Sequence, residues 1–224
     1  MFTEKDTCVL IPTYNREKDL GKAIESILKN SKKLGKVIVL DQSKNNNSRT
    51  LISKYAEKYK FIKYKHFKIA GTNLALNYGI NLSKKEGFKL TCIIADDVEI
   101  LPGFFEKLLA EFNSNSKVIG IGPTDVNDYN RFKENIYSTL KFKLTGLILE
   151  VLLLPHYDSH KVKILGPYGN TSTPYIKKDI IDCEWLPGFT TCYKTEVFED
   201  YKIPPRIGYD VIEDIDMGYY VYKK

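Results

Sequence analysis

Short apolar runs alternate with amphipathic segments over the first half of the chain. Four runs have the length and residue types of strands, at residues 7–11, 36–40, 61–67 and 90–95. After each run, apolar residues recur at helical spacing, in segments 18–28, 51–59, 73–83 and 104–112. Strands that alternate with helices predict an α/β fold with a mostly parallel central sheet and helices on both faces.

The regular alternation ends after a last apolar run at residues 118–121. Residues 123–182 are rich in Tyr, Lys and Asn around one apolar segment, 140–154. We expect a helix with long loops over the carboxyl edge of the sheet, because long irregular segments in compact domains are usually binding loops. No repeat or linker interrupts the sequence, so residues 1–224 are predicted to form a single domain.

The composition is that of an ordinary soluble domain. The chain has 224 residues, is 43% hydrophobic and carries a net charge of +6. This charge suits an anionic substrate or a membrane surface. The lysines are spread out and form no basic stripe with interleaved aromatic residues, so nucleic acid is not an expected partner.

The cysteines and the apolar segments bear on the compartment. The four cysteines lie far apart without metal-ligand spacing, and Cys8 and Cys92 fall in apolar strands, so we expect free thiols in a reducing compartment. The first residues lack the apolar core of a signal peptide, which favours the cytoplasm. The run 144–155 contains Glu150 and is too short to span a bilayer. Residues 147–154 form either a buried helix or a peripheral contact with the inner face of the membrane.

Two adjacent carboxylates follow the fourth predicted strand directly. Ligands of α/β proteins bind at the carboxyl ends of strands, and unpaired carboxylates are costly to bury. Asp96 and Asp97 therefore suit Mg²⁺ or Mn²⁺, which joins one or two carboxylates to a substrate diphosphate. The alternative is a solvated turn near a helix start. A glycine-rich phosphate loop is missing from the sequence, which argues against NAD chemistry and ATP hydrolysis.

Six segments, taken in order, resemble the family 2 glycosyltransferases, which have the GT-A fold. They are Val-Leu-Ile-Pro-Thr-Tyr-Asn-Arg at 9–16, Val-Ile-Val-Leu-Asp-Gln-Ser at 37–43, the Gly-x-x-x-Ala-x-Asn-x-Gly-Ile helix at 71–80, Asp-Asp at 96–97, Trp-Leu-Pro-Gly-Phe at 185–189, and Glu-Asp-Ile-Asp-Met at 213–217. The resemblance implies an inverting transfer of sugar from a nucleotide-diphosphate sugar, UDP-linked by preference, to a glycan or lipid-linked acceptor. It also divides the chain into a donor-binding half, 1–122, and an acceptor-binding half, 123–224.

The resemblance assigns roles to particular residues. Asp97 would ligate Mg²⁺ or Mn²⁺, Asp214 with Glu213 would provide the general base, and Trp185 and Gly188 would shape the acceptor pocket. Tyr14 would lie against the nucleobase, and Asp41 would accept a hydrogen bond from the base edge. The donor-binding set as a whole comprises Pro12, Thr13, Tyr14, Asn15, Arg16, Asp41, Ser43, Gly71, Asn77 and Asp96.

Structural alternatives stand beside these roles. Tyr14 and Trp185 can be packing residues, Asp41 can cap a turn, and the acids at 213–216 can complement a helix N-terminus. His66 is expected to be structural, and His156 and His160 receive no role.

The sequence departs from the family pattern at three places. Leu76 replaces the usual arginine, for which Lys68 or Arg16 would substitute, and Ala95 stands at the first position of the common Asp-x-Asp form, which leaves the Asp-Asp variant. The chain also ends at Lys224, as in a short or trimmed member. Leu76 and the early C-terminus keep open a catalytically silent nucleotide-sugar or glycan-binding domain. A sugar nucleotidyltransferase would need a glycine-rich basic loop after the first strand, where this chain has Pro-Thr-Tyr-Asn-Arg.

Overall fold

The structure, a computed structural model, describes residues 1–123, 163–165, 170–172 and 190–204. It also describes eight single positions nearer the C-terminus: Cys183, Leu186, Gly188, Met217, Gly218, Tyr220, Val221 and Lys223. Every structural statement below refers to these residues.

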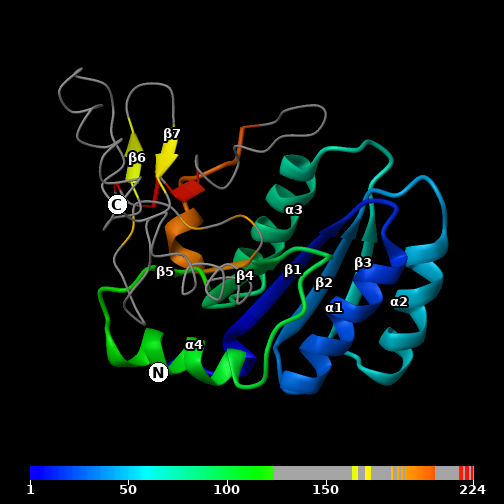
Figure 1. Cartoon of the computed structure of the whole chain (residues 1–224), viewed down its shortest axis with the longest axis horizontal. Helices are drawn as coiled ribbons and strands as arrows, with labels where there is room; N and C mark the ends of the chain where they lie inside the picture. Colours follow the sequence, from blue (N-terminus) through cyan, green and yellow to red (C-terminus); the bar gives the residue numbers. More distant parts are fainter. Residues whose placement is uncertain are drawn as a thin grey trace, which may run out of the picture.

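A six-stranded sheet forms the centre of the molecule (Figure 1). Its strand order is β3-β2-β1-β4-β8-β5. The strands are β1 (Thr7–Thr13), β2 (Lys36–Asp41), β3 (Ile62–His66), β4 (Leu90–Ile94), β5 (Gly120–Ile121) and β8 (Thr190–Lys194). The first four pair in parallel, and β8 runs antiparallel to both β4 and β5.

The alternating pattern of the sequence predicted these elements closely. The helices are α1 (Glu17–Asn30), α2 (Asn47–Lys58), α3 (Thr72–Lys85) and α4 (Phe104–Ser114), with 3₁₀ turns η1 (Glu4–Asp6) and η2 (Thr195–Phe198). Each predicted strand and helix of the first half is present, with ends shifted by a few residues. The predicted α/β class with a mostly parallel sheet is confirmed.

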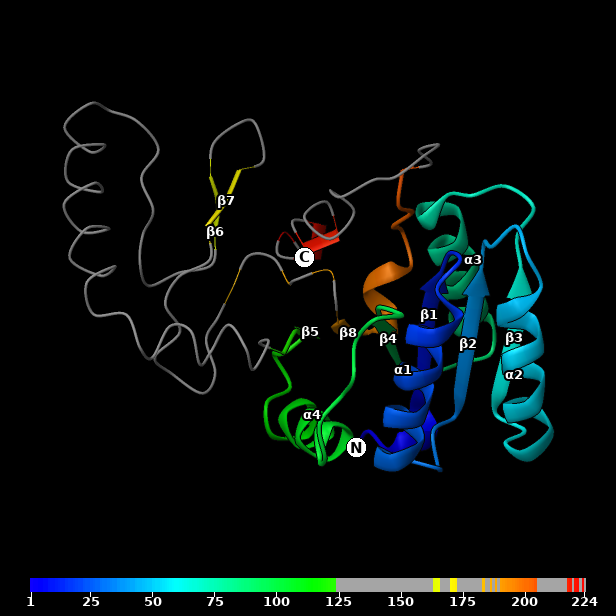
Figure 2. The same cartoon turned by 45° about the vertical axis from the view of Figure 1, so that its right-hand side comes forward.

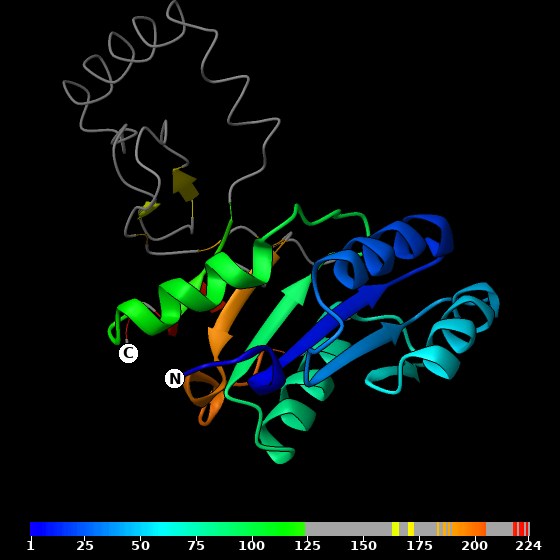
Figure 3. The same cartoon turned by 90° about the horizontal axis from the view of Figure 1, so that it is seen from below.

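Helices cover both faces of the sheet (Figures 2 and 3). On one face, α1, α2 and α4 pack on the odd-numbered side chains of β1 and β2 through an apolar core that includes Ile24 and Phe105. On the other face, α3 and η2 pack on the even-numbered side chains through Ile80 and Phe198. The central strands are therefore buried on both sides, as parallel sheets require.

Helix α3 approaches the sheet closely at one glycine. A Cβ atom at Gly79 would lie 2.9 Å from both terminal carbons of Leu10 and 3.1 Å from one of Leu40. Since real Cβ atoms do not come that close, only glycine allows α3 to lie at this depth.

The second half of the chain departs from expectation in two ways. Residues 123–182 were expected to form a helix and loops, yet the part described there contains an antiparallel pair, β6 (Lys163–Leu165) and β7 (Asn170–Ser172). Strand β8 was not foreseen either. No helix among the described residues has the length and apolar character needed to cross a membrane.

The expectation of a free thiol at Cys92 is wrong. Cys92 lies directly opposite Cys192 in the antiparallel β4–β8 ladder, and the two form a disulfide. They are 100 residues apart in the sequence, so spacing gave no sign of the pairing. Cys8 is outside the disulfide and is fully buried, as expected.

Candidate functional site at the carboxyl edge of the sheet

The direction of chain travel across the sheet reverses between β1 and β4. The chain proceeds from β1 to β2 and β3 on one side, and β4 then pairs with the other side of β1. Such a switch point opens a crevice beyond the carboxyl ends of the two strands. The β1–β4 pairing ends at Leu10 and Ile93, whereas β1 pairs with β2 as far as Thr13. Pro12, which has no N–H to donate, lies beyond the pairing with β4.

Two loops meet at this switch point and bring four predicted site residues together. The Thr13 hydroxyl donates to Asp96 Oδ2 over 2.7 Å. The Arg16 guanidinium donates to Asp97 Oδ2 over 2.9 Å and lies 3.4 Å from Asp96 Oδ1. The end of β1 supplies a hydroxyl, and the loop after it supplies a cation, to the two carboxylates that follow β4. The acids are therefore not a solvated turn alone.

The two carboxylates differ in exposure. The side chain of Asp96 is 8% exposed and that of Asp97 is 53% exposed. Burial raises the pKa of Asp96 above its ordinary value, and the hydrogen bond from Thr13 and the charge of Arg16 oppose this rise. Asp96 is therefore held in one orientation, while Asp97 presents oxygen atoms to solvent.

This pair of carboxylates suits a divalent cation whose coordination shell is completed by oxygen atoms of the substrate. Asp96 and Asp97 are hard oxygen ligands, and Mg²⁺ characteristically takes one or two carboxylates together with phosphates and water. The part of the chain that the structure describes contains no cluster of three or more His, Cys, Asp or Glu residues placed to hold a metal by themselves. Asp97 is the better-placed ligand, since it is the more exposed of the two.

The loop after β1 also joins the loop after β2. Asn15 has a φ of 54°, a left-handed conformation that asparagine tolerates better than most residues. Its N–H donates to Ser43 Oγ over 2.8 Å, and its Oδ1 accepts from the N–H of Lys44 over 3.2 Å. Tyr14, next to Asn15, is 40% exposed, so its ring is available to a ligand.

Asp41 at the end of β2 is completely buried. Its Oδ1 accepts from the N–H of Ser43 over 2.8 Å, which is the turn-capping geometry considered as an alternative above. Its Oδ2 accepts from the hydroxyl of Tyr64 over 2.6 Å. Tyr64 was not among the site residues predicted from the sequence. Its place among the inward positions of β3 is the signal that was available, because a tyrosine hydroxyl needs a partner when partly buried.

The start of α3 is joined to the same edge through Gln42, which was not among the predicted site residues. The N–H of Gly71, which precedes α3, donates to Gln42 Oε1 over 2.6 Å, and the N–H of Gln42 donates to the Thr13 carbonyl. Leu76, at the position of the family's arginine, is 2% exposed and belongs to the core between α3 and the sheet.

Asn77 lies on α3 and is 8% exposed. Its Nδ2 donates to the Ile203 carbonyl over 2.7 Å, and its Oδ1 accepts from the Ile203 N–H over 2.9 Å. One turn earlier, Asn73 donates to the carbonyl of Pro204 over 3.0 Å. Both amides thus hold the segment at 203–204 against α3.

The acceptor-side predictions fall mainly outside the described residues. Trp185, Glu213 and Asp214 lie outside them, as do His156 and His160. Gly188 is described and is exposed, and Leu186 beside it is buried in the core under α3. The predicted roles of these residues remain predictions.

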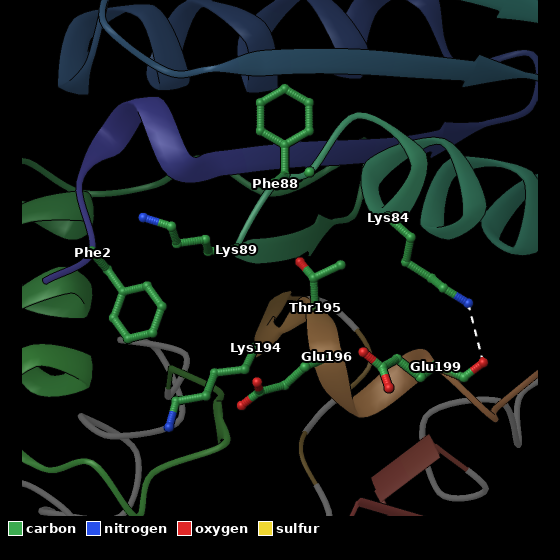
Figure 4. Close-up of a pocket in the computed structure, with 9 residues that line it drawn as sticks. Phe2, Lys84, Phe88, Lys89, Lys194, Thr195, Glu196 and Glu199 are labelled. Carbon is green, nitrogen blue, oxygen red and sulfur yellow. Dashed lines mark hydrogen bonds between the residues drawn. The ribbon is translucent and has the colours of Figure 1, made fainter.

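A hollow of about 450 Å³ lies at the opposite end of β4 from the two acids (Figure 4). It is lined in part by Lys84, Lys89 and Lys194, and none of the predicted site residues within the described part of the chain lines it. The three ammonium groups already bind oxygen atoms: the carbonyls of Phe198 and Glu199, the carboxylate of Asp6, and the carbonyl of Ser116, respectively. The crevice at the carboxyl edge is therefore the better candidate for chemistry.

Comparison with solved structures supports this fold. A mannosyltransferase from Pyrobaculum calidifontis, PcManGT, in complex with GDP-Man and Mn²⁺, aligns with a TM-score of 0.61 at 14% identity, over 95% of this chain and 50% of that one. S. aureus TarS 1-349 in complex with UDP-GlcNAc aligns with a TM-score of 0.59 at 17% identity, over 96% of this chain and 53% of that one. The GT-A fold expected from the resemblance is confirmed.

Sequence comparison indicates the family. The uncharacterized glycosyltransferase YibD of Escherichia coli (strain K12) is 30% identical over 101 residues, which are 45% of this chain and 28% of that protein. This chain therefore spans less than a third of YibD and about half of the two solved chains. The profile of the glycosyl transferase family 2 matches residues 8–168, well over half of the sequence. The chain belongs to glycosyl transferase family 2.

Proposed function

We propose that this chain transfers a sugar from a nucleotide-diphosphate sugar, UDP-linked by preference, to a glycan or a lipid-linked acceptor, with inversion at the anomeric carbon. The observation that carries the proposal is the meeting of the β1 and β4 loops, where Thr13 and Arg16 contact Asp96 and Asp97. Membership of the family supports it. The solved relatives in complex with GDP-Man and with UDP-GlcNAc support a nucleotide-sugar donor.

The residues of the crevice have different roles in donor binding. Tyr14 stacks on the nucleobase with its exposed ring, and Asn15 and Ser43 hold the loop that carries it. Thr13 fixes Asp96, which contacts the ribose or the cation. Arg16 is 44% exposed and can turn toward the diphosphate, in place of the arginine that Leu76 replaces.

A divalent cation on Asp97 would offset the negative charge that develops on the leaving diphosphate. The complex of PcManGT with Mn²⁺ supports this choice of ion. Asp214, next to Glu213, removes the proton of the acceptor hydroxyl as it attacks, a contribution of about 10²–10⁴-fold in rate. Trp185 and Gly188 shape the acceptor pocket. The net charge of +6 suits an acceptor at an anionic membrane surface.

The experiment compares Asp97→Asn with Asp19→Asn in Mn²⁺-dependent donor hydrolysis. Asp19 on α1 is the matched control, because its side chain is 48% exposed against 53% for Asp97, and both variants lose one negative charge. We expect Asp97→Asn to lower kcat about 100-fold or more, since several kcal/mol of charge stabilisation is lost. Asp19→Asn should retain wild-type turnover.

Equal rates in the two variants would remove the role of Asp97. Nucleotide binding by calorimetry without any turnover would instead favour the silent binding domain. Titration with UDP, GDP and CDP, with and without Mn²⁺, identifies the nucleotide in the same experiment.

A further inference from the structure

Asp41 cannot touch a nucleobase in the arrangement that the structure shows. Its exposure is 0%, and each carboxylate oxygen already accepts a hydrogen bond, one from Ser43 and one from Tyr64. Asp41 also lies inside the backbone ladder, where its carbonyl accepts from Phe67 over 2.8 Å. A ligand could reach the remaining lone pairs of the Asp41 carboxylate only if the groups that cover it moved aside.

Tyr64 lies on β3, the outermost strand on this side of the sheet, which pairs with the strand that carries Asp41. It is partly exposed, whereas Asp41 is not. The tyrosine has a single hydroxyl proton, and the 2.6 Å bond commits this proton to Asp41 Oδ2. The Tyr64 oxygen keeps its lone pairs, so toward a ligand the hydroxyl acts as an acceptor.

The proton stays on Tyr64 at neutral pH. Burial raises the pKa of its phenol well above the ordinary value, and the hydrogen bond to Asp41 raises it further. The phenol is therefore neutral and its only proton faces the carboxylate. Together Tyr64 and Asp41 offer lone pairs and no donor to whatever approaches.

We propose that Tyr64 reads the edge of the donor's nucleobase and selects bases with a ring N–H, namely uracil through N3–H or guanine through N1–H. Cytosine and adenine carry an unprotonated ring nitrogen at the corresponding position, and its lone pair would face the lone pairs of Tyr64. Asp41 acts as a positioning residue, because it sets the direction of the Tyr64 proton. This inference rests on the proposed use of a nucleotide-sugar donor at the same crevice.

The test measures nucleotide affinity by calorimetry in the presence of Mn²⁺. The ligands are UDP, GDP, CDP and the N-methylated analogues N3-methyl-UDP and N1-methyl-GDP. The proteins are the wild type, Tyr64→Phe and Tyr55→Phe. Tyr55 on α2 is the matched control, because its hydroxyl also donates to a carboxylate, Glu25, over 3.0 Å.

We expect the wild type to bind the better of UDP and GDP at least about 10-fold more tightly than its methylated analogue and than CDP, since a hydrogen-bonded group would be left unpaired. Tyr64→Phe should weaken binding of the parent nucleotide about 10-fold. The parent nucleotide and its methylated analogue should then bind this variant with nearly equal affinity. Tyr55→Phe should behave as the wild type. Asp41→Asn should lower the ratio of UDP affinity to CDP affinity. The side-chain amide of asparagine would donate to the Tyr64 oxygen, so the Tyr64 proton would be free to point toward the ligand.

Two results would overturn the inference in different ways. If nucleotides bind and Tyr64→Phe keeps or increases the wild-type preference for the parent nucleotide, Asp41 or another group reads the base and the role of Tyr64 is refuted. If the wild type binds none of the nucleotides, the proposed function fails together with the inference. If Asp41→Asn does not fold, the result for Tyr64→Phe is sufficient to decide between these outcomes.

Discussion

Replacement of Asn77 by alanine tests how α3 holds the segment that leads to the predicted general base. The amide of Asn77 makes both hydrogen bonds to the Ile203 backbone, at 2.7 and 2.9 Å, across 126 residues of sequence. Ile203 is 0% exposed and Asn77 is 8% exposed, so water does not readily replace the lost amide. Alanine at position 77 leaves one N–H and one C=O of Ile203 without this partner.

The expected loss follows from these two groups. A buried donor or acceptor left unsatisfied costs about 1–3 kcal/mol, and partial relaxation of the segment places the sum at roughly 2–4 kcal/mol. Asn77→Asp should cost at least as much, because it sets a carboxylate oxygen against the Ile203 carbonyl. Asn81→Ala is the control on the same helix, since Asn81 is exposed. It should change stability by less than about 0.7 kcal/mol, the range of helix propensity.

Urea unfolding measures the free energy of unfolding of each variant by linear extrapolation, and calorimetry with UDP measures donor affinity. The structural role of Asn77 in holding Ile203 would be refuted if the free energy of unfolding of Asn77→Ala fell by less than about 0.5 kcal/mol while its UDP affinity fell strongly. That result would support the original prediction that Asn77 contacts the donor.

Other substitutions and reagents probe the packing that supports the site. Gly79→Ala should destabilise the chain by about 1 kcal/mol, because overpacking of about 1–3 kcal/mol against Leu10 exceeds the helix propensity that alanine adds. Gly21→Ala on α1, where a Cβ meets its nearest atom at 3.6 Å, should stabilise it by about 0.5–1 kcal/mol; thermal unfolding that gives both variants the same sign would contradict the close approach of α3. Burial raises the pKa of the Cys8 thiol to about 12, so this thiol should not react with a disulfide reagent at pH 8 until urea unfolds the chain, whereas the partly exposed Cys183 should react at once. Native labelling of Cys8, located by mass spectrometry, would show that the core opens at β1.

The local pattern of side chains carried most of the information about the elements. Leu20, Ile24 and Ile27 are fully or nearly fully buried because their spacing places them on one face of α1. The short apolar runs became central strands because both faces of a parallel sheet are covered. The position of Asp96 and Asp97 directly after such a strand was also sufficient to predict that they lie at the carboxyl edge of the sheet.

Contacts between distant segments were decided only by the tertiary structure. The sequence by itself determined the α/β order, the approximate ends of the elements and which loops carry polar groups. These features depend on the spacing of apolar residues that are close together in the sequence. It did not determine that Tyr64 binds Asp41, that Asn77 holds Ile203 or that Cys92 lies opposite Cys192. Those pairs depend on strand register and on the direction in which β8 enters the sheet, and neither leaves a periodic trace in the sequence.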